Sequence, residues 1–173
     1  MKLWKTIDKY FSTEEISEIF NDKNFKPFTT QWYSIGSLTP FQTKLIDGAQ
    51  EAVASSFKNL SDVIGVEQWT HDASMHELPE LHFDKDENLY EKSGDLRYPI
   101  LSIILYLTID DLKGADLFIL GKSAQYGETK VIPEAGKVVY IAPGVLHGVS
   151  PYVSGKRISV NMNLWDYDVR SSK

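Results

Sequence analysis

The chain has 173 residues, of which 42% are hydrophobic and 12% aromatic, and this is enough for one substantial core. A formal charge of −6 argues against binding to a nucleic-acid backbone, which needs a concentrated basic face. The absence of cysteine excludes disulfides, thiolate metal sites and a cysteine nucleophile. Because no apolar run is long enough for a signal peptide or a membrane span, we expect one cytoplasmic domain over residues 1–173.

Two helices are expected within about residues 1–60. In residues 12–20, a serine or threonine N-cap precedes acidic residues, and apolar residues recur at Ile16, Ile19 and Phe20. A longer helix is predicted within residues 39–57, where Pro40 stands near the start. Its apolar face would comprise Phe41, Leu45, Ile46, Ala49 and Val53.

From Val63 onward the pattern changes to short β-rich runs separated by Gly, Pro, Asp and Asn. The runs are residues 63–70, 100–109, 115–120, 127–132, 136–143 and 157–165. Six or more short strands after two helices predict a mainly β fold, a sandwich or jelly roll, with the helices packed on one sheet. The β core would occupy about residues 63–166.

The stretch LHFDKDE contains a candidate pair of metal ligands. Strand alternation would place His82 and Asp84 on one face and Phe83 on the other. A third ligand is expected at His147, where a strand gives way to a glycine-flanked turn. Two imidazoles and one carboxylate suit Fe(II), Mn(II) or Zn(II). A different metal set that uses His71 and His76, just before the motif, stays open at this point.

A second candidate site lies ten residues after His147, where Arg157 interrupts an apolar, strand-like run. A period of two places Arg157, Ser159, Asn161 and Asn163 on one face. An inward arginine beside a hydroxyl forms a carboxylate clamp, because the guanidinium can bond both carboxylate oxygens. The alternative is a solvated edge strand with Arg157 at the surface.

The order of these motifs resembles that of the Fe(II)- and 2-oxoglutarate-dependent oxygenases, and it is closest to their prolyl 4-hydroxylase-like branch. The resemblance covers Glu67 to Trp165 and implies a double-stranded β-helix. It implies that His82, Asp84 and His147 bind iron. It also implies that Arg157, Ser159 and Tyr106 hold the distal carboxylate of 2-oxoglutarate.

The implied reaction uses O2 and 2-oxoglutarate to hydroxylate a C–H bond and releases succinate and CO2. Three departures from the prolyl 4-hydroxylase pattern put a prolyl substrate in doubt: Arg157 stands where lysine is frequent, Thr108 replaces an asparagine, and Ala115 and Asp116 alter a hairpin. We therefore expect a small polar substrate, such as an amino acid, a peptide or a biosynthetic intermediate. Candidate substrate residues are Trp69, His71, Asn161 and Asn163.

Three alternatives are a cupin-like metal enzyme of another reaction type, a peptidyl-prolyl hydroxylase and a β-sandwich binding module without catalysis. The polar segment 85–98 is expected to be a loop that could act as a lid over the site.

Overall fold

The structure is a computed structural model that describes residues 3–23, 25–53, 60–75, 79–121 and 128–172. The helices are α1 (Thr13–Asn21), α2 (Pro40–Val53) and α3 (Glu87–Ser93), and the strands before α3 are β1 (Trp4–Ile7), β2 (Gln31–Ser34) and β3 (Gly65–Asp72). The later strands are β4 (Leu101–Gly114), β5 (Leu117–Gly121), β6 (Thr129–Val131), β7 (Val138–Ile141), β8 (Leu146–Val149) and β9 (Tyr152–Trp165).

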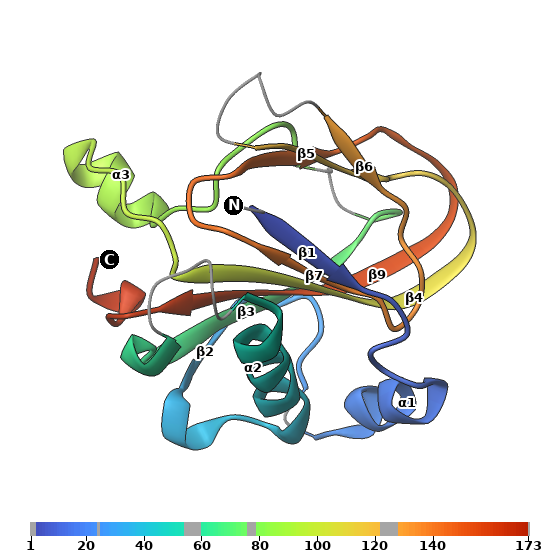
Figure 1. Cartoon of the computed structure of the whole chain (residues 1–173), viewed down its shortest axis with the longest axis horizontal. Helices are drawn as coiled ribbons and strands as arrows, with labels where there is room; N and C mark the ends of the chain where they lie inside the picture. Colours follow the sequence, from blue (N-terminus) through green and yellow to red (C-terminus); the bar gives the residue numbers. More distant parts are fainter. Residues whose placement is uncertain (1–2, 24, 54–59, 76–78, 122–127, 173) are drawn as a thin grey trace.

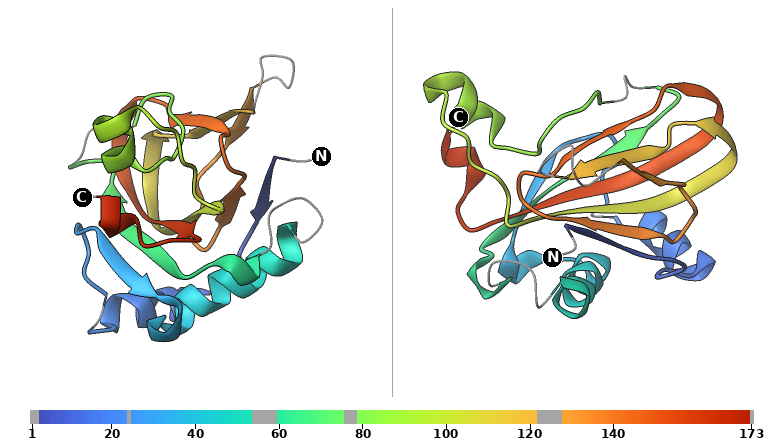
Figure 2. Two further views of the ribbon diagram at one scale, coloured as in Figure 1. Left: turned by 90° about the vertical axis from the view of Figure 1, so that its left-hand side faces the viewer. Right: turned by 45° about the horizontal axis from the view of Figure 1, so that its top comes forward.

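The strands form two antiparallel sheets that face each other, with α1 and α2 on the outer side of the larger sheet (Figures 1 and 2). The larger sheet has the order β1-β7-β4-β9-β3-β2, and the smaller one has the order β6-β5-β8. This mainly β jelly roll, with helices packed on one sheet, confirms the fold class predicted from the sequence. Within the described residues, no helix combines the length and apolar character needed to cross a membrane.

Alternation along the central strand β4 divides the apolar side chains between two cores. Ile103, Leu105 and Leu107 belong to the core that also contains the buried residues of α1 and α2. Ile104 and Tyr106 belong to the other core, together with residues of the smaller sheet. Successive strand residues point to opposite faces, so β4 is buried on both sides.

The two N-terminal helices occur where the sequence predicts them. The Ser12 hydroxyl accepts a hydrogen bond from the Glu15 amide, and the Glu15 carboxylate accepts one from the Ser12 amide, which is a complete capping box. Ile16 and Ile19 are buried, whereas Phe20 is exposed. Helix α2 begins at Pro40, and the last residues of the predicted helix, 54–57, lie outside the described part.

The segment predicted as a loop between residues 85 and 98 instead contains helix α3. The Asp86 carboxylate caps its N-terminus by accepting a hydrogen bond from the Leu89 amide (3.0 Å). Gly94, with a φ of 76°, ends the helix in the left-handed conformation. The expectation of a loop was wrong because these two capping residues stabilise a helix of only seven residues in a polar sequence.

The core between α2 and the larger sheet should control stability. Leu45 is fully buried in this core, so Leu45→Ala should lower the free energy of unfolding by roughly 2–5 kcal/mol. Chemical denaturation followed by circular dichroism measures the change. The matched control is Leu96→Ala, which removes the same atoms at a half-exposed position and should cost less than about 0.5 kcal/mol. Equal losses in both variants would contradict this assignment of the core.

Candidate functional site

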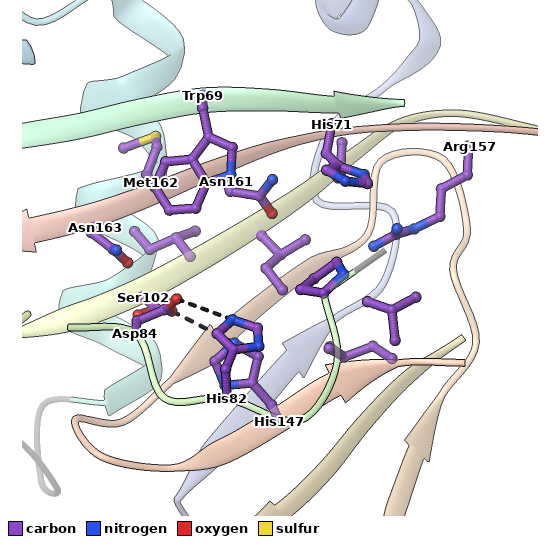
Figure 3. A pocket seen from close by; sticks show the side chains of 16 residues that line it. Trp69, His71, His82, Asp84, Ser102, His147, Arg157, Asn161, Met162 and Asn163 are labelled. Atoms are coloured by element: carbon purple, nitrogen blue, oxygen red, sulfur yellow. Dashed lines mark ion pairs between the residues drawn. The ribbon is translucent and has the colours of Figure 1, made fainter. Parts of the chain in front are cut away.

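A cavity of about 250 Å³ lies between the two sheets (Figure 3). The residues of its wall come from β3, β4, β5, β8 and β9 and from the segment before α3: Trp69, His71, Pro79, His82, Asp84, Ser102, Ile103, Ile104, Leu117, His147, Val149, Arg157, Ser159, Asn161, Met162 and Asn163. The structure therefore brings together candidate residues that are up to 94 positions apart, from Trp69 to Asn163.

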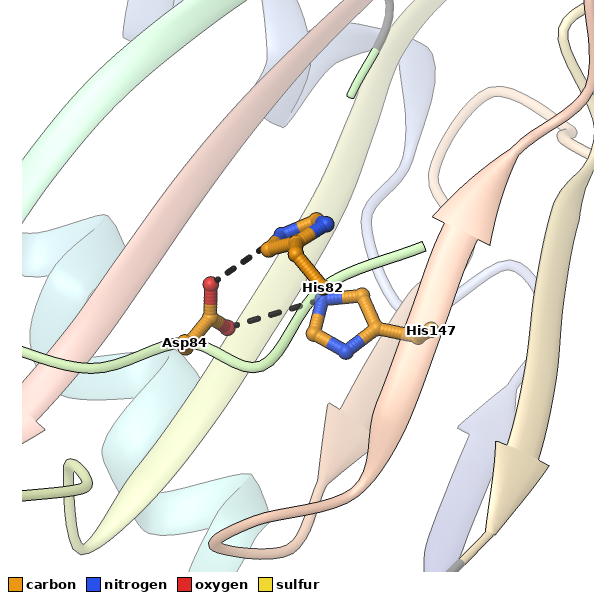
Figure 4. Close-up of side chains that lie close together, drawn as sticks. All are labelled: His82, Asp84 and His147. Atoms are coloured by element: carbon orange, nitrogen blue, oxygen red, sulfur yellow. Dashed lines mark ion pairs between the residues drawn. The ribbon is translucent and has the colours of Figure 1, made fainter. Parts of the chain in front are cut away.

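The three candidate metal ligands meet in this wall (Figure 4). The Nε2 atoms of His82 and His147 lie 3.5 and 3.6 Å from the two carboxylate oxygens of Asp84. One ligand atom from each residue lies within 4.8 Å of the other two. Such a group could hold a divalent transition-metal ion through two imidazoles and one carboxylate.

The backbone places the two histidines opposite each other. The His82 amide donates to the His147 carbonyl (2.8 Å), and the His147 amide donates to the His82 carbonyl (3.0 Å). Two details of the sequence prediction were wrong. His82 lies in an isolated bridge and not in a regular strand, and His147 lies within β8 and not in the turn before it. The short strand β8 was missed because His147 and Gly148, two of its four residues, interrupt the β pattern.

Both imidazoles are oriented by backbone carbonyl groups. His82 Nδ1 lies 2.7 Å from the Glu80 carbonyl oxygen, and His147 Nδ1 lies 2.9 Å from the Val145 carbonyl oxygen. A carbonyl oxygen only accepts, so each Nδ1 carries the proton and donates it. In the neutral imidazole each Nε2 then carries the lone pair that a metal ion would take, which is how imidazole ligands of metal ions are held; in the metal-free protein a proton on His82 Nε2 would bond Asp84 instead.

The electrostatics of the group favour the protonation states that metal binding needs at Asp84 and His147, whereas at His82 a metal ion would have to displace a proton. Burial raises the pKa of Asp84, but His82, His147 and the Ser102 hydroxyl together outweigh it, so the pKa is lowered. Burial also lowers the pKa of His147 and outweighs the effect of Asp84. For His82, burial is outweighed by the hydrogen bonds to Asp84 and to the Glu80 carbonyl, and the pKa is raised. Asp84 is thus ionised and His147 neutral at neutral pH.

Polar side chains form a ladder across three neighbouring strands on the cavity side of the larger sheet. Directly opposite residues of an antiparallel pair share a face, and Ser159, Asn161 and Asn163 of β9 are each flanked by one residue of β3 and one of β4. The rows of this ladder are His71–Ser159–Tyr106, Trp69–Asn161–Ile104 and Glu67–Asn163–Ser102.

Arg157 extends this ladder at its end and is buried, with 3% of its surface exposed. Its Nε and Nη1 atoms, the Tyr106 hydroxyl and the Ser159 hydroxyl are all buried without a hydrogen-bond partner in the described part of the chain. Burial raises the pKa of Tyr106, although the charge of Arg157 acts in the opposite direction, so the phenol stays protonated and can donate. Buried donors without acceptors are costly. A bound carboxylate would satisfy this donor cluster, and the alternative of a solvated edge strand does not apply.

The four candidate substrate residues, Trp69, His71, Asn161 and Asn163, all line the cavity. The wall also contains Ile104, Leu117 and Val149, so its character is mixed and not uniformly polar. His76 lies outside the described residues.

Sequence reasoning missed two polar residues of the ladder, Ser102 and Glu67. Their signal was present, because each interrupts a β-rich run at a position that alternation assigns to the cavity face.

Comparison with known proteins identifies the fold. No family model matches the chain, and no curated protein matches it. Among solved structures, a prolyl-4-hydroxylase from Pseudomonas putida is 17% identical with a TM-score of 0.59, over 94% of this chain and 84% of that chain. A viral collagen prolyl hydroxylase from Paramecium Bursaria Chlorella virus-1 is 16% identical with a TM-score of 0.60, over 94% and 89%.

An oxidoreductase of the 2OG-Fe(II) oxygenase family from Burkholderia pseudomallei is also similar, at 12% identity and a TM-score of 0.58, over 95% of this chain and 85% of that chain. The chain thus has the fold of these oxygenases, and the resemblance seen in its sequence is confirmed at the level of the fold.

Proposed function

We propose that this chain is an Fe(II)- and 2-oxoglutarate-dependent dioxygenase that hydroxylates a small polar substrate. The observation that carries the proposal is the coexistence, in one cavity, of the ligand group and the buried donors of Arg157, Tyr106 and Ser159. The ligand group alone would fit many metal enzymes. A carboxylate clamp in the same cavity is what a 2-oxo dicarboxylic acid requires.

The residues present fit both cofactors. His82, Asp84 and His147 would hold the iron, and Arg157 with Tyr106 and Ser159 would hold the distal carboxylate of 2-oxoglutarate. When bound, the two cofactors supply O2 activation: one oxygen atom enters the substrate C–H bond as a hydroxyl group, and the other enters succinate as CO2 leaves.

The protein residues contribute orientation and charge balance. Arg157 would neutralise the cosubstrate's distal carboxylate at a position where its guanidinium is shielded from water, and a charge-assisted bond is strong there. The two backbone carbonyls that fix the imidazoles keep both Nε2 atoms directed at the metal position. By the resemblance to the oxygenases, the presence of Asp84 favours hydroxylation over halide transfer, since members that transfer halide lack this carboxylate.

The asparagines of β9 support a polar substrate. Asn161 and Asn163 line the cavity on the same face as the clamp, and an amide can both donate and accept. A peptidyl-prolyl substrate is the second candidate, on the similarity of fold to the prolyl hydroxylases. A cupin-like enzyme of another reaction type would share the histidines but would not need the Arg157 donors. A binding module would show no iron-dependent turnover.

The ligand assignment can be tested by metal binding. Wild-type protein should bind one Mn(II) ion, a spectroscopic substitute for Fe(II), as measured by electron paramagnetic resonance. Loss of a residue that only hydrogen-bonds to a metal ligand typically lowers metal affinity by about 10–100-fold. Loss of a ligand itself, in His147→Ala, should therefore weaken Mn(II) binding by roughly a hundredfold or more. His71→Ala is the matched control, because His71 lines the cavity outside the ligand group, and it should bind Mn(II) like the wild type. Equal binding by His147→Ala and the wild type would contradict the assignment.

The cosubstrate can be detected directly. Anaerobic addition of Fe(II) and then 2-oxoglutarate should produce the visible metal-to-ligand charge-transfer band of a chelated 2-oxo acid. Asp84→Ala should lose the band because it loses the metal. Wild-type protein that binds Fe(II) but never develops the band would favour the cupin-like alternative.

The clamp can be separated from a structural arginine. Arg157→Gln removes charge-assisted bonds worth roughly 1.5–3 kcal/mol each, so the affinity for 2-oxoglutarate should fall by about tenfold or more. Titration of the charge-transfer band measures it, and Mn(II) binding should persist. Lys156→Gln removes an exposed positive charge one residue away and should leave the affinity unchanged. An unchanged affinity in Arg157→Gln would refute the clamp.

A further inference from the structure

A second cavity, of about 310 Å³, adjoins the first one on the side of the ligand group. The two cavities share Trp69, His82, Asp84 and Asn163 in their walls. The wall of the outer cavity also contains Glu67 and residues 85–88, at the start of α3. A molecule could therefore extend from the outer cavity to the ligand group past Trp69 and Asn163.

The wall of the outer cavity is acidic. Among the described residues of this wall are four carboxylates, Glu67, Asp84, Asp86 and Glu87, and one lysine, Lys85, beside the imidazole of His82. Lys85 already forms an ion pair with Glu87 (2.8 Å). A negative wall of this kind attracts a cation and repels an anion.

The other carboxylates of the wall differ in position and surroundings. Asp84 belongs to the ligand group. Asp86 caps α3 with one oxygen, and its other oxygen accepts a hydrogen bond from the Tyr167 hydroxyl. Glu67 is the carboxylate that the sheet itself directs toward the cavity, since it lies on β3 in the same alternation as Trp69.

Asn163 provides an independent indication of a ligand. Its side chain is buried, with 4% exposed, and its Oδ1 atom has no hydrogen-bond partner in the described part of the chain. It lies directly opposite Glu67 in the β3–β9 pair, so both side chains project from the same face. A buried acceptor next to a carboxylate calls for a donor that carries positive charge.

The neighbouring row of the ladder fits the same ligand. Trp69 lies two positions from Glu67 on the same face and lines both cavities. The face of an indole ring attracts cations, including ammonium and guanidinium groups.

We infer that the substrate carries a protonated nitrogen, an amine or a guanidine, that binds between Glu67 and Asn163 beside Trp69. This inference rests on the proposed function and specifies the substrate class of that site. The cationic group occupies the outer cavity, and the C–H bond to be oxidised lies toward the ligand group. Glu67 is thus a specificity-determining residue and takes no part in holding iron or 2-oxoglutarate.

The experiment uses ligand pairs of nearly equal size that differ in charge. The probes are benzylamine and pentylamine, each paired with the alcohol of the same carbon skeleton, in which a neutral hydroxyl group replaces the ammonium group. Binding is measured by isothermal titration to the anaerobic protein loaded with Fe(II) and 2-oxoglutarate. Turnover cannot occur without O2, and Asp84 is then committed to the metal.

At least one amine should bind about tenfold more tightly than its alcohol partner, which is the size of one charge-assisted bond. Glu67→Gln should remove this preference, and Asn163→Leu, which loses the acceptor, should reduce it. Glu91→Gln is the charge-matched control: it removes a negative charge from an exposed position of α3 and should keep the preference. If no amine is preferred, or if Glu67→Gln keeps the preference, the inference is overturned.

A variant of reversed charge distinguishes a loss of the cation site from a folding defect in Glu67→Gln. Glu67→Lys should exchange the preference, so that phenylacetate binds more tightly than benzylamine in the presence of saturating 2-oxoglutarate. Retention of the amine preference in Glu67→Lys would also overturn the inference.

The charge-transfer band separates this inference from the proposed function. With the band present and no amine preference, only the substrate class is wrong, whereas absence of the band in wild-type protein contradicts the dioxygenase itself.

Discussion

The antiparallel pairing of β4 with β9 is the constraint on which the rest of the molecule depends. Both strands have 14 residues, and they lie side by side in the middle of the larger sheet. Val160 and Leu164 of β9 enter the core beneath the helices, whereas Arg157, Ser159 and Asn163 face the cavity. A slip of one residue would turn the guanidinium into the apolar core and Leu164 into the cavity, so burial itself fixes the register.

This register also separates charge within the cavity. Arg157 and Asn163 lie at opposite ends of the row of β9 side chains, and Asp84 lies near the Asn163 end (Figure 3). In our proposal the Arg157 end therefore suits the distal carboxylate of the cosubstrate, and the Asn163 end, where Glu67 lies opposite on β3, suits a cation. In our proposal, the anionic cosubstrate and a cationic substrate cannot exchange places, because each would meet its own charge at the wrong end. The backbone bridge between His82 and His147 holds these two candidate ligands side by side.

Much of this arrangement could be predicted from the sequence, for physical reasons that apply to particular residues. Arg157 stood out because a charged side chain in an apolar strand needs a partner, and alternation by two then assigned Ser159, Asn161 and Asn163 to its face. Helix α1 was recognisable from its capping box. The pairing between distant strands could not be predicted from the sequence. Strands β1, β2 and β8 have four residues each, and runs this short do not show which strand each one pairs with. The meeting of Glu67 with Asn163 depends on the β3–β9 register, which no local pattern encodes.

The most direct test of the account is a crystal structure of the protein grown anaerobically with Mn(II) and 2-oxoglutarate. The account predicts one ion bound by His82 Nε2, His147 Nε2 and the Asp84 carboxylate. It further predicts 2-oxoglutarate in the same cavity, with its distal carboxylate against Arg157, Tyr106 and Ser159. An ion bound elsewhere, or 2-oxoglutarate that leaves the Arg157 guanidinium without a carboxylate, would contradict it.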